Sequence, residues 1–308
     1  MRASGFQRAS EVMGRVGTAV AIGLAGVVFV SVGLTSSGVT SFTESVVAEP
    51  TPPSAGAVSP GPTTTQVRLM RPATTRPVVV LYGDSLAWES QEHFRDAFAG
   101  NPDVDVITRT FGGTAICDFL DDMRDDVATL RPVAAVVEFS GNAFTPCMMD
   151  RAGQPLRDEA FLERYRADAA ALVGIFGPAG TEVYFAGAPI PRPSDGRGHF
   201  NGGKLNAMYQ RIASSHAPQV QFVDAGAAVL DGGRWTETLP CLRDEPCTGG
   251  TDASGRAVDV VRAPDGDHFC PASAAARAGV SGPCPVWSSG AYRYGRAMAA
   301  PVLDALVG

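Results

Sequence analysis

The hydrophobic pattern of this chain consists of short apolar runs that alternate with longer amphipathic stretches. Runs of four to eight β-branched and apolar residues predict strands buried on both faces. Apolar residues at helical spacing predict helices that follow these strands. The predicted strands cover residues 78–82, 104–108, 133–139, 182–186 and 220–223, and the predicted helices cover residues 87–94, 116–130, 159–176, 204–215 and 289–307.

This alternation of strands and helices predicts the fold class. Strands that alternate with helices form a parallel sheet covered by helices on both faces. We therefore expect an α/β fold, a three-layer α/β/α sandwich with a mainly parallel five-stranded sheet, over residues 77–308. A stretch rich in Gly, Pro and Cys over residues 224–285 interrupts the pattern before the last helix.

The N-terminal part has a different pattern. Arg2, Arg8 and Arg15 lie in a basic segment, residues 1–15, which precedes an uncharged apolar run over residues 16–34. Basic residues before such a run predict a cytoplasmic N-terminus, and the run is long enough to span a bilayer. We favour a transmembrane anchor over a cleaved signal sequence, because the candidate cleavage site at residues 46–48 lies far from the run.

Residues 35–76 are rich in Pro, Thr, Ser and Ala. Such a composition buries too little apolar surface to order itself, so we expect a disordered linker. Either reading of the apolar run exports the rest of the chain, at the extracytoplasmic face of the membrane or in secreted form. The formal net charge is −7, and no basic cluster is interleaved with aromatic residues, which argues against a nucleic-acid partner.

Candidate chemistry begins where the first apolar run ends. Gly83, Asp84 and Ser85 follow this run and precede a predicted helix. Ligands of open α/β sheets bind at the carboxyl ends of strands, and a helix start offers free N–H groups and the positive end of its dipole. Ser85 is therefore a candidate nucleophile.

A serine nucleophile needs a base, and the base needs an orienting group. The chain has four histidines. His268 follows Asp265 by three residues, so that one tight turn can hold both a base and its carboxylate. His199 in a loop is the alternative base, whereas His93 lies on a predicted helix and His216 lies at the end of another.

Acyl transfer also requires hydrogen-bond donors for the developing oxyanion. The backbone N–H of Ser85 is one candidate. Gly112 and Gly113 follow the second predicted strand, and the sequence leaves open which of them donates. Asn142 follows the third predicted strand and offers a side-chain amide.

Taken in order, these motifs resemble the four blocks of the SGNH (GDSL) hydrolase superfamily. The motifs are Gly83-Asp84-Ser85-Leu86, Gly112, Gly141-Asn142 and Asp265-x-x-His268. The resemblance implies a flavodoxin-like fold and carboxylic ester hydrolysis by a serine nucleophile. It also implies Ser85, His268 and Asp265 as catalytic residues, and Ser85, Gly112 and Asn142 as oxyanion donors. Many members carry an aspartate after the asparagine, where this chain has Ala143.

Six cysteines all follow the linker. An even number in an exported domain predicts three disulfides, and no group of Cys and His has zinc-site spacing. A Cys117–Cys147 bridge would join the two loops that carry oxyanion donors. The remaining predicted pairs are Cys241–Cys247 and Cys270–Cys284.

These observations predict an exported serine esterase that cleaves short acyl or acetyl esters of lipids or envelope glycans without a metal or organic cofactor. One alternative is an O-acyltransferase that acts on cell-envelope glycans. The alternative from another class is a non-catalytic surface-binding module. We expect the loops at residues 189–203 and 224–255 to shape the substrate pocket, whereas the sequence does not indicate the oligomeric state.

Overall fold

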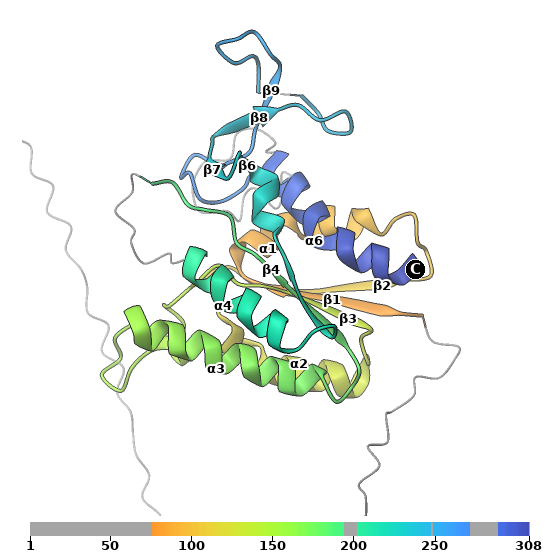
Figure 1. The fold of residues 1–308 in the computed structure, drawn as a ribbon, viewed down its shortest axis with the longest axis vertical. Coiled ribbons are helices and arrows are strands. Elements are labelled where there is room, and N and C mark those ends of the chain that lie inside the picture. The colour runs from red at the N-terminus through yellow and green to blue at the C-terminus, as the bar shows by residue number, and fades with distance from the viewer. Residues whose placement is uncertain (1–75, 194–201, 248, 272–288, 308) are drawn as a thin grey trace, which may run out of the picture. The chain divides into compact units, whose positions relative to one another are not determined.

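The computed structural model describes residues 76–193, 202–247, 249–271 and 289–307 (Figure 1). Its centre is a five-stranded parallel sheet with the strand order β2-β1-β3-β4-β5. This order and the helices on both faces confirm the predicted fold class. The strands are β1 Val78–Gly83, β2 Asp105–Thr110, β3 Ala134–Glu138, β4 Glu182–Ala186 and β5 Val220–Val223.

Helices cover both faces of the sheet. Figure 1 shows α1 and α6 on one face and α2, α3 and α4 on the other. The helices are α1 Ser85–Ala97, α2 Leu120–Thr129, α3 Asp158–Phe176, α4 Gly202–Ser215 and α6 Ser289–Val307, with short 3-10 turns at η1 Ile116–Asp118, η2 Pro146–Met148 and η3 Ala225–Val229. Two small antiparallel pairs, β6 Leu230–Asp231 with β7 Arg234–Trp235 and β8 Thr238–Pro240 with β9 Val258–Val260, follow the sheet.

The position of β1 between two helical layers explains why its sequence is continuously apolar. Val80 and Tyr82 belong to the core shared with α2, α3 and α4, whereas Val79 and Leu81 belong to the core shared with α1 and α6. Successive side chains of a strand point to opposite faces, so a strand covered on both sides needs apolar residues at every position.

Three elements differ from the sequence expectations. The helix expected over residues 116–130 is split at Phe119 into η1 and α2. Helix α1 begins at Ser85, two residues earlier than expected, because the Asp84 side chain caps it by accepting the N–H of Leu86. The pairs β6–β7 and β8–β9 have strands of two or three residues, which are too short to show a periodic pattern.

The expectations for the N-terminal part lie outside the described residues. The basic segment 1–15, the apolar run 16–34 and most of the linker 35–76 therefore stay predictions. Within the part of the chain that the structure describes, no helix combines the length and apolarity needed to cross a membrane.

Gly83 shows how tightly the carboxyl end of β1 is packed. A Cβ atom built on Gly83 would lie 2.5 Å from the carbonyl oxygen of Glu138 and would overlap the Cβ of Ala87. We expect Gly83→Ala to lower the free energy of unfolding by about 3 kcal/mol, because neither contact can relax without moving β3 or α1. Denaturant unfolding would measure this loss.

The matched control for this substitution is Gly100→Ala. Gly100 is exposed, and a Cβ built there meets no atom within 4 Å. Its substitution should change stability by no more than about 1 kcal/mol. Equal stabilities of the two variants would contradict the close packing inferred at Gly83.

Candidate active site

Ser85, His268 and Asp265 form a hydrogen-bonded chain at the carboxyl end of β1. The Oγ of Ser85 lies 3.0 Å from Nε2 of His268, and Nδ1 of His268 lies 2.6 Å from Oδ2 of Asp265. If Nδ1–H donates to Asp265, Nε2 is left to accept the hydroxyl proton of Ser85. The two histidine contacts thus have the geometry that a nucleophile, a base and an orienting carboxylate require.

The turn that carries Asp265 and His268 is held by its own hydrogen bonds. Oδ1 of Asp265 accepts the backbone N–H groups of Asp267 and His268, each at 3.0 Å. Gly266 lies between Asp265 and Asp267 with a φ of 85°, a conformation that glycine adopts without strain. The alternative base His199 lies outside the described residues.

The electrostatics of this pair favour an ion pair between carboxylate and imidazolium. Burial disfavours the charge on Asp265, but hydrogen bonds from His268 and from two backbone N–H groups hold its pKa below the usual range. Burial also disfavours the imidazolium ion, yet the hydrogen bond to Asp265 and the charges of Glu89 and Asp265 raise the pKa of His268 to about 9. The base therefore becomes neutral in the alkaline range.

The candidate oxyanion donors lie around Ser85. A Cβ built on Gly112 would lie 3.8 Å from the Cβ of Ser85, whereas one built on Gly113 would have no neighbour within 4 Å. Gly112 is thus the glycine adjacent to Ser85. Asn142 lines the same pocket as Ser85 and His268. The three groups come from loops after β1, β2 and β3.

Asp84 ties Asn142 to the start of α1. Oδ2 of Asp84 accepts the side-chain amide of Asn142 at 3.0 Å, and the N–H and hydroxyl of Ser140 at 2.7 Å each. Its Oδ1 accepts the N–H of Leu86 at 3.1 Å. An amide nitrogen has two hydrogens, so Asn142 keeps one for a ligand. Asp84 therefore orients a donor and the nucleophile's helix together.

Glu138 is a second buried acid beneath the site, and the sequence analysis missed it. Both Glu138 and Asp84 are fully buried. Oε2 of Glu138 accepts the N–H of Ala87 at 3.1 Å, and its Oε1 lies 3.2 Å from the hydroxyl of Tyr294. Burial and the nearby charge of Asp84 raise the pKa of Glu138 well above its usual value. A single acid in the apolar run 133–139 was the available signal.

A small pocket opens beside Ser85. Its cavity volume is about 80 Å³, well below that of sites that enclose a drug-sized ligand. Most of its exposed wall is apolar, and the residues that form this apolar part are Leu86, Ala188, Pro189, Pro191 and Gly202. The loop expected at residues 189–203 contributes to this pocket. In the described part of the chain, no residue of the loop expected at 224–255 lines it.

Two disulfides that the sequence predicts are present in the structure. Cys117 is bonded to Cys147, and Cys241 is bonded to Cys247. Cys270 is also disulfide-bonded, but Cys284 lies outside the described residues, so the 270–284 pair stays a prediction. The first bridge joins η1, which follows the Gly112 loop, to η2, which follows Asn142.

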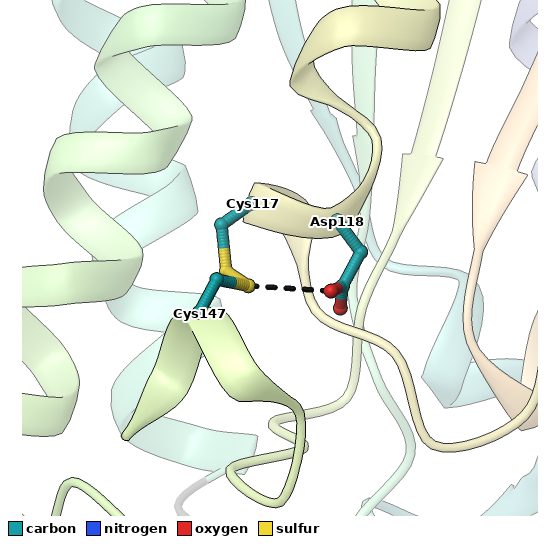
Figure 2. A group of neighbouring side chains, drawn as sticks. All are labelled: Cys117, Asp118 and Cys147. Carbon is teal, nitrogen blue, oxygen red and sulfur yellow. Dashed lines mark hydrogen bonds between the residues drawn. A yellow bond between two sulfur atoms is a disulfide. The ribbon is translucent and has the colours of Figure 1, made fainter. Parts of the chain in front are cut away.

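Figure 2 shows Asp118 beside this first bridge. Its Oδ2 accepts the N–H of Ala115 at 2.8 Å, and its Oδ1 accepts the hydroxyl of Thr145 at 2.5 Å. Because both sulfur atoms are in the disulfide, this group offers no thiolate to a metal ion. Asp118 instead joins the same two loops as the bridge.

Four sequence blocks that are far apart along the chain thus meet at one edge of the sheet, and the sheet has the strand order of flavodoxin-like proteins. This convergence places the chain in the SGNH (GDSL) class of α/β proteins, in agreement with the sequence resemblance. Within that class, residues 78–278 match the family described as "Protein of unknown function (DUF459)", and the chain belongs to this family. No curated protein matches the chain.

Solved structures with a similar chain trace include three bacterial proteins. A GDSL-like lipase from Bacteroides thetaiotaomicron is 15% identical, with 78% of this chain and 94% of that chain covered and a TM-score of 0.47. A lipase/acylhydrolase from Enterococcus faecalis is 14% identical, with 74% and 96% covered and a TM-score of 0.47. A catalytic mutant of an acetylxylan esterase from Geobacillus stearothermophilus is 14% identical, with 49% and 77% covered and a TM-score of 0.40.

Proposed function

We propose that the protein is a serine ester hydrolase. The observation that carries this proposal is the continuous hydrogen-bonded chain from Ser85 through His268 to Asp265, at the mouth of a pocket that Asn142 also lines. In this mechanism, Ser85 attacks the ester carbonyl while His268 takes the hydroxyl proton. His268 then returns the proton to the leaving alcohol, and an acyl-serine remains.

Deacylation uses the same groups in reverse roles. His268 removes a proton from water, and the resulting attack on the acyl carbonyl releases the acid and restores Ser85. During both steps the negative charge on the carbonyl oxygen faces the N–H groups of Ser85 and Gly112 and the amide of Asn142. Each such donor typically contributes about 10²–10³ in rate.

The pocket supports short acyl groups as substrates. Its walls contain two prolines, an alanine and a glycine, and proline restricts backbone motion. A fixed apolar wall of this size suits acetyl and other short acyl esters better than long chains. We place these esters on lipids or envelope glycans, because the apolar run at residues 16–34 and the following linker suggest export to the outer face of a membrane.

Ester hydrolysis by the purified full-length chain tests the proposal. We expect turnover of 4-nitrophenyl esters that declines from acetate to octanoate, and a serine-reactive phosphonate should modify the peptide that contains Ser85. Product that appears on an added glycan would instead indicate acyl transfer. If neither turnover nor phosphonate labelling occurs, the protein is a binding module and the proposal is wrong.

A further inference from the structure

Glu89 is a buried acid beside the site, and the mechanism above does not use it. It lies four residues after Ser85, so both residues are on the same face of α1, one turn apart. Its side chain is 3% exposed. Helical side chains point toward the N-terminus of their helix, and this direction brings the carboxyl of Glu89 toward the turn that carries the base.

The carboxyl of Glu89 contacts that turn directly. Its Oε2 accepts the backbone N–H of Phe269 at 2.8 Å. Phe269 follows His268 and is itself fully buried against the core of α1 and α6. This hydrogen bond spans 180 residues of sequence and joins the helix of the nucleophile to the loop of the base.

We propose that Glu89 is a positioning residue of the site. Its carboxyl fixes the loop of His268 against the helix of Ser85. The inference rests on the proposed function, because it assigns His268 as the base.

The charged groups that face Glu89 come from two segments. His268 and Asp265 face it from the turn, and Asp84 faces it from the end of β1. Helix α6 packs against α1, but its Arg293 pairs with Glu245, and its Arg296 lies over the ring of Tyr292. Neither of these arginines neutralises Glu89.

This environment makes the charge of Glu89 sensitive to pH. Burial raises the pKa of Glu89 to about 8, although the charge of His268 opposes the rise. The anionic form of Glu89 in turn raises the pKa of His268. The protonation of Glu89 and the protonation of His268 therefore depend on each other.

Two substitutions separate the positional role from the charge role. Glu89→Gln keeps an oxygen that can accept the N–H of Phe269 but removes the charge. We expect its kcat at pH 10 to stay within about threefold of wild type, while the pH midpoint of kcat/KM falls by about 1 unit. Glu89→Ala removes both, and kcat should fall about 10²-fold with little change in KM, since the base is no longer held in place.

Hydrogen exchange gives a readout that does not depend on activity. In Glu89→Ala, the amide of Phe269 should exchange faster than in wild type, whereas in Glu89→Gln it should stay protected. Glu92→Gln and Glu92→Ala are matched controls, because Glu92 lies on the same helix and is partly exposed. Both controls should match wild type in rate, pH profile and exchange.

The outcomes distinguish the inference from the proposed function. If wild type hydrolyses no ester, the proposed function fails, and the exchange of Phe269 still tests the positional role. Wild-type kcat and wild-type exchange in Glu89→Ala would overturn the positional role. An unchanged pH midpoint in Glu89→Gln would overturn the charge role.

Discussion

Ser85→Ala should lower kcat/KM for 4-nitrophenyl acetate by at least about 10⁴-fold, because it removes the atom that forms the acyl-enzyme. His268 and Asp265 keep their mutual hydrogen bond in this variant, so the fold should be retained. The residual rate would come from the oxyanion donors and from substrate binding. Steady-state kinetics measures the loss, and thermal unfolding shows whether the fold is intact.

Ser90→Ala is the matched control for this substitution. Ser90 lies on the same helix and is fully buried, and its hydroxyl has no hydrogen-bond partner among the described residues. Removal of this hydroxyl should leave both the rate and the stability close to wild type. Substantial hydrolysis by Ser85→Ala would show that another group is the nucleophile.

Asp265→Asn should lower kcat by about 10⁴-fold, because an amide no longer fixes the tautomer of His268 or stabilises its imidazolium form. The acid limb of the pH profile should also move. In wild type, kcat/KM should rise with pH and level off above about 9, where His268 loses its proton. Without the charge of Asp265, the pKa of His268 falls, so the residual activity should rise at lower pH. Rate measurements from pH 5 to 10 test this shift.

The raised pKa of His268 in wild type has the opposite consequence for stability. A histidine whose folded pKa is raised stabilises the fold below its unfolded pKa, and this contribution is lost as pH rises through about 9. Wild type should therefore gain activity over the pH range in which this contribution declines.

Asp244→Asn, at an exposed loop position, is the control for Asp265→Asn and should change neither the activity profile nor the stability profile. Equal pH midpoints in wild type and Asp265→Asn would contradict the assigned pair.

The sheet could be predicted because each central strand is buried on both faces. The apolar run at 133–139 indicates a strand for this reason, and β3 lies within it as Ala134–Glu138. The break at Phe119 was not predictable, since apolar residues continue at helical spacing through it. The short strands β6 to β9 are set by the packing of a loop-rich region, and two or three residues contain no period to detect.

The hydrogen-bonded chain of the site could be predicted because its groups occupy turns at the ends of strands. The acids that support it were missed. Glu138 is marked only as the one acid in an apolar run, and the contact of Glu89 to Phe269 spans 180 residues. No local pattern marks a carboxyl whose partner lies that far away. The pocket wall at residues 188–191 likewise depends on how the chain leaves β4.

The contact between Ser85 and His268 spans 183 residues. The nucleophile and the other two oxyanion loops come from residues 83–142, whereas the base arrives after the whole sheet and two small hairpins. A contact between residues so far apart in sequence closes a long loop, which costs entropy and slows folding. A chain folded only through β3 would hold a serine and its oxyanion donors but no base. Onset of ester hydrolysis during refolding would therefore report when the catalytic turn docks onto α1.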